Sequence, residues 1–286
     1  MAKGRELKGR IKTVENTKKI TRTMEMVATS KMKRAQDRVV AARPYATSLT
    51  DVISSLYNAE LAERFPLLRQ PAQVRKAAVI LLTTNRGMCG GFNANLIREA
   101  RGLLTTLREQ GVEPEIHVVG RKGIGYFRYI GQALAVSRTD ITDRPTAEDA
   151  ASLVDALMAQ FVSGAIDAVY VVYANFKSAI ATPPATLKVL PVDPPARKGQ
   201  MPDYLLYPSA DAIVTELLPA YVRNAVYRAL VETVAGEQGA RRTAMKNATD
   251  NATEVLGVLR RTYNRARQAN ITQEIAEIVG GAAALE

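Results

Sequence analysis

The chain has 286 residues and a mass of 31.1 kDa, which is enough for one large domain or two of ordinary size. Its single cysteine, Cys89, excludes an intrachain disulfide, and its single histidine, His117, excludes a zinc site with several Cys and His ligands. The formal net charge of +11 predicts an acidic partner, which is nucleic acid, anionic lipid or an acidic protein surface.

The positive charge is concentrated at the two ends of the sequence. Residues 1–43 contain thirteen Lys or Arg against four Asp or Glu, and residues 240–286 contain seven against five. The stretch between them has nineteen of each and is neutral. We therefore expect the acidic partner to meet the terminal segments, above all the first.

Residues 1–59 predict one long helix, in which Pro44 is the only proline. Alternating steps of four and three visit a line of residues that we call the first seam: Leu7, Ile11, Val14, Lys18, Thr21, Glu25, Ala28, Met32, Ala35, Val39, Ala42, Ala46, Leu49, Ile53 and Leu56. Such a line is typical of a coiled coil. Polar residues interrupt the seam from Lys18 to Glu25, so we expect the helix to leave its partner there and contact another neighbour.

Residues 75–195 predict a small α/β domain of Rossmann-like type. Apolar runs at 77–84, 115–120, 168–173 and 186–192 are typical of strands, and the spacing at 93–109 and 147–161 is helical. This alternation favours a sheet covered by helices. Prolines then crowd residues 183–208 and predict an irregular connection to the next segment.

Residues 209–286 predict a second long helix. Its second seam is Val231, Val234, Gln238, Arg241, Met245, Ala248, Ala252, Val255, Leu259, Thr262, Ala266 and Ala269. Pro219 either kinks this helix or marks its first turn. Helices of about 55 and 70 residues are roughly 80 and 105 Å long, more than a globule of this size needs. The expected fold is a long antiparallel coiled coil of the terminal helices with the small α/β domain between them in sequence.

The sequence carries few marks of catalysis. His117 lies in a predicted strand and is expected to fill the core or a sheet face, although a pairing of His117 with Cys89 stays open. The loop at 85–91 follows a strand and precedes a helix, where phosphate-binding loops occur. It lacks both G-x-G-x-x-G and G-K-[ST], so its glycines favour a tight turn instead. We expect a scaffold domain with no catalytic residue, cofactor or metal.

Four segments closely resemble the gamma-subunit family of F-type ATP synthases. They are KITRTMEMVATSKMKRAQ at 19–36, TTNRGMCGGFNANL at 83–96, ARRTAMKNATDNA at 240–252 and YNRARQANITQEIAEIVGGAAAL at 263–285. The resemblance spans essentially the whole chain. It implies a rotating central stalk whose coiled coil enters a hexamer of alpha and beta subunits, with epsilon beside the α/β domain and the c-ring of the membrane sector beneath. Proton flow through the c-ring would turn the stalk and drive the beta sites through their states.

The resemblance also implies where the stalk meets the beta subunits. The matching positions are Met24 on the first helix and Arg241, Arg267, Gln268 and Thr272 on the second. The small, nearly uncharged tip at 280–285 is expected in an apolar sleeve. Some family members carry paired regulatory cysteines in an insert, which Cys89 alone cannot supply.

The N-terminal sequence shows no apolar leader, and the longest apolar runs are too short to span a bilayer. We therefore expect a bacterial protein peripheral to the cytoplasmic face of the plasma membrane, without direct membrane insertion and without nucleic acid as a partner. Two alternatives stay open. A basic coiled coil that binds nucleic acid predicts steeply salt-dependent binding, and a Rossmann-like nucleotide enzyme predicts turnover by the isolated chain.

Overall fold

The computed structural model describes residues 2–56, 64–178, 181–193 and 209–283. They form two compact units. Unit 1 consists of Met1–Ala28 and Arg241–Glu286, and unit 2 of Thr29–Ala240. Two long helices, α1 (Ala2–Leu56) and α6 (Ala210–Ala283), contribute residues to both units.

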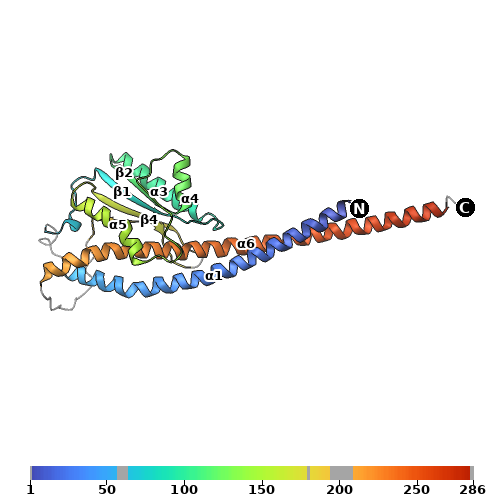
Figure 1. Ribbon diagram of the computed structural model, residues 1–286, viewed down its shortest axis with the longest axis horizontal. Helices are drawn as coiled ribbons and strands as arrows, with labels where there is room; N and C mark the ends of the chain where they lie inside the picture. Colours follow the sequence, from blue (N-terminus) through green and yellow to red (C-terminus); the bar gives the residue numbers. More distant parts are fainter. Residues whose placement is uncertain (1, 57–63, 179–180, 194–208, 284–286) are drawn as a thin grey trace. The chain divides into compact units, whose positions relative to one another are not determined.

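Unit 2 contains a five-stranded sheet in the order β3-β2-β1-β4-β5. Figure 1 labels β1, β2 and β4 of this sheet. The strands are β1 (Lys76–Leu82), β2 (Glu113–Val119), β3 (Val136–Arg138), β4 (Ala168–Ala174) and β5 (Pro184–Leu190). The first four are parallel to their neighbours, and β5 is antiparallel to β4. This is the strand order of a doubly wound α/β fold with an antiparallel edge. The Rossmann-like prediction is confirmed.

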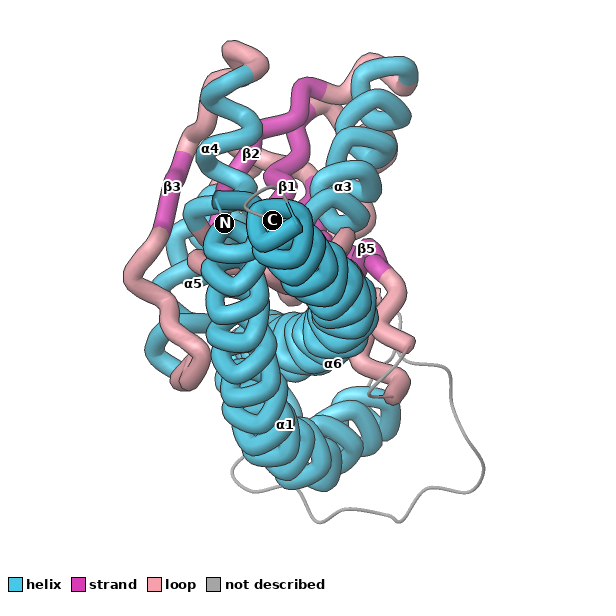
Figure 2. The backbone as a smooth tube through the Cα atoms, turned by 90° about the vertical axis from the view of Figure 1, so that its right-hand side faces the viewer, coloured by secondary structure: helices cyan, strands magenta, loops and turns pink. Residues whose placement is uncertain are grey.

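Helices cover both faces of this sheet. Because side chains alternate along a strand, Ala77, Val79 and Leu81 of β1 face α3 (Phe92–Glu109) and α4 (Arg121–Tyr129). The alternate β1 residues Ala78, Ile80 and Leu82 face α5 (Ala147–Val162) and α6. Figure 2 shows α3 and α4 on their side of the sheet, with β3 at its edge. The part of α6 that lies in unit 2 is thus a core helix of the α/β domain.

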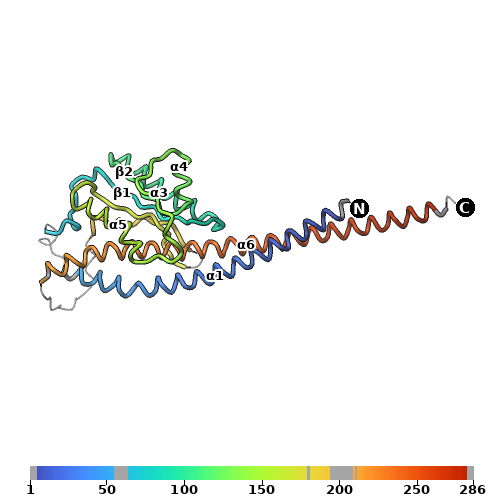
Figure 3. The backbone as a smooth tube through the Cα atoms, viewed as in Figure 1, coloured from blue at the N-terminus to red at the C-terminus, as the bar shows by residue number. Residues whose placement is uncertain are grey.

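The two long helices run antiparallel to each other within unit 2, as the chain path in Figure 3 shows. Seam residues of α1 are buried there, namely Met32, Ala35, Val39, Ala46, Leu49 and Ile53. Ala35 and Val39 pack against Val231 and Ala235 of α6. The first seam is confirmed over this stretch.

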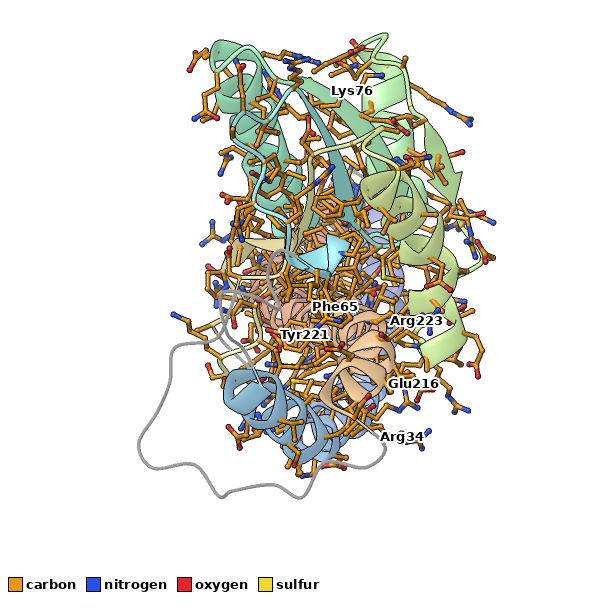
Figure 4. All side chains as sticks on the ribbon, turned by 90° about the vertical axis from the view of Figure 1, so that its left-hand side faces the viewer. Arg34, Phe65, Lys76, Glu216, Tyr221 and Arg223 are labelled. Atoms are coloured by element: carbon orange, nitrogen blue, oxygen red, sulfur yellow. The ribbon has the colours of Figure 1, made fainter. Side chains whose placement is uncertain are left out.

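Ion pairs add directional contacts between the long helices and the rest of unit 2. Lys31 of α1 meets Asp143 with 2.5 Å between Nζ and Oδ2, and this hydrogen bond is the main reason that the pKa of Asp143 is lowered. Arg223 of α6, labelled in Figure 4, donates two hydrogen bonds to Asp155 of α5 at 2.7 and 3.0 Å. A two-point guanidinium–carboxylate contact fixes orientation as well as distance.

The predicted strands and helices of the central domain are confirmed with boundary shifts of one or two residues. Helix α4 and strand β3 are additional elements that the sequence pattern did not indicate. Pro219 neither begins α6 nor lies in its first turn, because the helix begins at Ala210.

In unit 1 the second seam is partly wrong. Leu256 is 5% exposed and belongs to the seam, whereas the predicted Val255 is 46% exposed. In the same way Tyr263 and Asn270 are half-buried where exposed Thr262 and Ala269 were expected. The observed line takes a step of four from Met245 to the buried Thr249, where the prediction took a step of three to Ala248. The observed seam therefore runs through the buried Thr249, one residue away from the predicted Ala248.

Candidate functional site

All five positions that the resemblance assigned to subunit contacts lie in unit 1. Met24 belongs to α1, and Arg241, Arg267, Gln268 and Thr272 belong to α6. The described residues of unit 1 all belong to these two helices, so the packing of one helix on the other decides which side chains are buried and which are exposed.

Two side-chain contacts fix the antiparallel register within unit 1. Thr249 donates a hydrogen bond to the hydroxyl of Thr21 at 2.8 Å, and both residues are buried. Further along, Arg260 of α6 meets Glu15 of α1, with 2.6 Å between Nη2 and Oε1. A buried polar pair in a helix seam specifies register, because an axial slip leaves a hydroxyl without its partner.

The expectation that α1 leaves its partner between Lys18 and Glu25 is wrong. Thr21 is buried, and Lys18 and Glu25 are half-buried on the same face. The polar seam residues are accommodated because Thr21 donates to the carbonyl of Lys18 at 3.1 Å while it accepts from Thr249. The helix thus keeps its partner through this stretch.

The five predicted contact residues form two groups. The register places Met24 about 8 Å along the helix axis from the level of Arg241, which is between one and two helical turns. Met24 is half-buried, and Arg241 is 8% exposed with its side chain in the seam. Arg267, Gln268 and Thr272 are exposed and lie about 40 Å further along α6. The five residues therefore lie at two levels of the helix pair, and Arg241 exposes little of its side chain.

Exposed apolar side chains accompany both groups. Near Met24, the outer face of α1 carries Ile20, Met26 and Val27, each half exposed or more. Beyond Arg267, α6 carries a stripe that we call the tip stripe: Ile271, Ile275, Ile278 and Val279. The predicted tip comprised residues 280–285 only. The i, i+4, i+7, i+8 spacing of the stripe is nevertheless visible in the sequence. Residues 284 and 285 lie outside the described part of the chain.

Most of the tip stripe lies on a part of α6 that the described part of α1 does not reach. Because Glu15 is level with Arg260, the first described residue of α1 is level with about residue 272 of α6. From Ile271 to Gly281 every residue of α6 is exposed within unit 1. Apolar side chains clustered on one side of such a helix mark a contact with another protein.

The surface of unit 1 is also basic. The exposed residues of its α1 segment include Lys8, Arg10, Lys12, Lys19 and Arg22. Of the acidic residues there, Glu6 pairs with Arg10 and Glu15 pairs with Arg260. A surplus of cations therefore remains for an acidic partner.

The loop at 85–91 connects β1 to α3 and has several polar groups engaged within the protein. Asn85 Nδ2 donates to the carbonyls of Thr139 and Ile141, and Asn85 Oδ1 accepts from Arg121 N–H at the start of α4. At the start of α3, Phe92 N–H donates to the Cys89 carbonyl at 3.3 Å. These contacts are those of a structural connection between β1, α3 and α4.

The remaining candidates for chemistry are also in structural roles. His117 is 7% exposed on a sheet face, and its Nε2 lies 2.9 Å from Glu115 Oε1, as expected for a sheet-face residue. Cys89 is buried, and Asn93 donates to its sulfur at 3.2 Å. Across the described residues, His, Cys, Asp and Glu nowhere gather in a group of three that could hold a metal. None of the helices described is both long and apolar enough for a membrane span.

Solved structures confirm the architecture. The central stalk and c-ring assembly of the Tetrahymena thermophila mitochondrial ATP synthase contains a chain with 25% identity and a TM-score of 0.60, covering 80% of this chain and 99% of that one. A rotor chain of the Euglena gracilis mitochondrial ATP synthase has 21% identity and a TM-score of 0.65, covering 94% and 99%. The second likeness supports the fold alone.

Sequence comparisons reach further. The family model described as ATP synthase matches residues 3–285. The ATP synthase gamma chain of Gemmatimonas aurantiaca is 66% identical over 289 residues, covering all of both chains. That of Frankia casuarinae is 43% identical, covering 98% of this chain and 97% of its own. On this full-length similarity, the chain belongs to the gamma-chain family of the ATP synthases.

Proposed function

We propose that this chain is the rotating central shaft of an F-type ATP synthase and is itself non-catalytic. Its partners are the alpha and beta subunits of the catalytic hexamer, the epsilon subunit and the c-ring of the membrane sector. The observation that carries the proposal is the surface of unit 1, where a helix pair presents exposed apolar and basic side chains at two levels.

A pair of helices can act on three surrounding sites in turn because its sides, viewed around the long axis, carry different side chains. One side of unit 1 is α1 with its basic residues, and the other is α6. A beta subunit therefore meets a different surface at each angle of the shaft. Only such differences in contact free energy can shift a site between conformations.

Met24, Arg241, Arg267, Gln268 and Thr272 are the proposed contact points with the beta subunits. Their side chains are flexible or small and polar, which suits contacts that form and break as the shaft turns. A large, interlocked apolar interface would hold the shaft at one angle. Arg241 has a second task, because its buried side chain lies in the seam and so supports the helix pair as well.

The tip stripe supports a bearing at the far end of α6. Four branched apolar side chains, Ile271, Ile275, Ile278 and Val279, are costly to leave in water. A smooth apolar sleeve in the hexamer would bury them without directional bonds, so rotation would meet little resistance. In this proposal the sleeve begins near Ile271, well before the glycines at 280 and 281.

The rest of the chain connects the shaft to the membrane sector. We propose a functional division into residues 1–59 and 209–286 as the shaft and 75–195 as the α/β domain beside epsilon. The protein would be peripheral at the cytoplasmic face of a bacterial plasma membrane, held there through the c-ring.

Reconstitution tests the proposal. The chain is mixed with alpha and beta subunits of the same enzyme, and assembly and ATP hydrolysis are measured, with a mixture lacking the chain as control. We expect one copy in each three-plus-three assembly and hydrolysis that depends on it. A chain that stays outside the assembly would refute the proposal.

A further inference from the structure

The end of strand β4 projects beyond its neighbour β1. The register pairs Val172 of β4 with Leu81 of β1, and β1 ends one residue later. On the other side β4 stays paired with β5, and Asn175 N–H still donates to the Pro183 carbonyl at 2.9 Å. Because backbone N–H groups alternate along a strand, those of Ala174 and Phe176 point toward the side where β1 is missing.

Helix α6 supplies the two missing acceptors. Thr233 Oγ1 accepts from Ala174 N–H at 3.2 Å, and Glu232 Oε2 accepts from Phe176 N–H at 3.3 Å. Both contacts are buried. A buried N–H without an acceptor is strongly unfavourable, so these two side chains act in place of a strand.

A glycine on the same side of α6 brings the helix close to the sheet. A Cβ at Gly236 would lie 3.1 Å from Phe92 Cε2, 3.2 Å from Ala174 Cβ and 3.3 Å from Thr182 Cβ. Such distances are tighter than ordinary van der Waals contact, so a side chain at this position would force α6 or its neighbours to shift by a few tenths of an ångström. The glycine thus keeps the two hydrogen bonds within reach.

We propose that Glu232, Thr233 and Gly236 form the joint through which torque passes between the α/β domain and α6. The apolar contacts between α6 and the sheet and the Arg223–Asp155 contact with α5 hold the helix in place. The two hydrogen bonds at the end of β4 add resistance to rotation of the helix about its own axis, because a rotation that carries the acceptor oxygens away from the N–H groups weakens both. This inference rests on the proposed rotor function and assigns Glu232 and Thr233 as positioning residues for coupling.

The charges around Glu232 suit this role. Arg228 lies one turn earlier on α6, with 3.7 Å between Nη2 and Oε1, and the positive charge of Arg43 acts from α1. Oε1 thus faces the cation while Oε2 accepts from Phe176 N–H. One carboxylate therefore links α6, the end of β4 and the charge on α1.

Paired variants test the joint. Thr233→Val keeps the shape of the side chain and removes the acceptor, while Thr233→Ser retains the hydroxyl. Likewise Glu232→Leu removes the acceptor, while Glu232→Gln retains an amide oxygen in its place. The first measurement is hydrogen exchange of the Ala174 and Phe176 amides in the full chain. The second is the number of protons pumped per ATP hydrolysed by the complete enzyme in sealed vesicles.

We expect amide exchange at 174 in Thr233→Val and at 176 in Glu232→Leu to rise about tenfold or more. The proton-to-ATP ratio should fall in both, and Ser and Gln should restore both readouts. Unchanged amide exchange in the variants would overturn the assignment of the two hydrogen bonds. Faster amide exchange with an unchanged proton-to-ATP ratio would overturn their role in coupling. A wild-type chain that neither assembles nor pumps would refute the rotor proposal instead, while exchange would still test the joint.

Discussion

The phase of the seam on α6 makes a sharp prediction about two neighbouring residues. Leu256→Ala removes a side chain that is 5% exposed, whereas Val255→Ala changes one that is 46% exposed. Buried Leu-to-Ala changes cost about 2–5 kcal/mol, and we expect about 2 kcal/mol because a two-helix core is thin and closes easily over a cavity. Val255→Ala should cost less than about 0.5 kcal/mol, since alanine is the better helix former.

Native-state hydrogen exchange measures this difference in unit 1 alone. A loss of about 2 kcal/mol should speed exchange of the slowest amides between residues 245 and 270 by about 30-fold in Leu256→Ala. Val255→Ala is the matched control, because it lies on the same turn of the same helix and should leave exchange nearly unchanged. Equal effects of the two substitutions, or a larger effect of Val255→Ala, would refute the assigned seam.

Three further predictions concern other parts of the chain. Met24→Lys should lower the ratio of protons pumped to ATP hydrolysed while the enzyme still assembles; an unchanged ratio would count against Met24 as a contact. Removal of residues 280–286 should be tolerated at least in part, as gel filtration of the assembled enzyme would show, and complete loss of assembly would contradict it. Burial raises the pKa of Glu232, so the folded protein holds the proton of this carboxyl more tightly than the unfolded chain does. The protonated carboxyl therefore contributes stability that is fully present below the pKa of the unfolded chain and is lost as the pH rises through the pKa of the folded protein. Glu232→Gln should therefore flatten the pH dependence of urea unfolding above about pH 4.5, and parallel profiles would argue against the assignment.

The long helices could be predicted because their signal is repeated many times. The seam pattern of α1 recurs along a helix of 55 residues, and Pro44 is the only proline inside that helix. Helix α4 escaped prediction because it contains Gly123 and Gly125, which lower helix propensity. Gly123 is needed there, since a Cβ would lie 2.8 Å from Thr83 Oγ1, and the buried Phe127 holds the helix by packing.

The phase of the second seam and the continuity of α1 through Lys18 to Glu25 could not be read from local pattern. Both include a buried threonine, and Thr21 and Thr249 form a hydrogen bond although they are 228 residues apart in sequence. Hydrophobic periodicity treats a threonine as a break, whereas a paired hydroxyl is compatible with burial. The tip stripe, in contrast, is visible in the sequence, because Ile271, Ile275 and Ile278 have the spacing of residues on one face of a helix.

The same limit applies to the joint on α6. Thr233 and Glu232 resemble ordinary helix residues in the sequence, and only the offset between the ends of β1 and β4 gives their oxygens a partner. A local pattern cannot report where one strand ends relative to another. The α/β domain was thus predictable as a fold, while its attachment to α6 was not.

Direct observation of rotation tests the central claim. The chain is assembled with its alpha and beta subunits, the hexamer is fixed to a surface, and a visible probe is attached to the α/β domain through an engineered cysteine at the exposed Tyr129. The account predicts continuous rotation in one direction that requires ATP and stops when ATP is removed. ATP hydrolysis by the complete assembly with the probe stationary would contradict it.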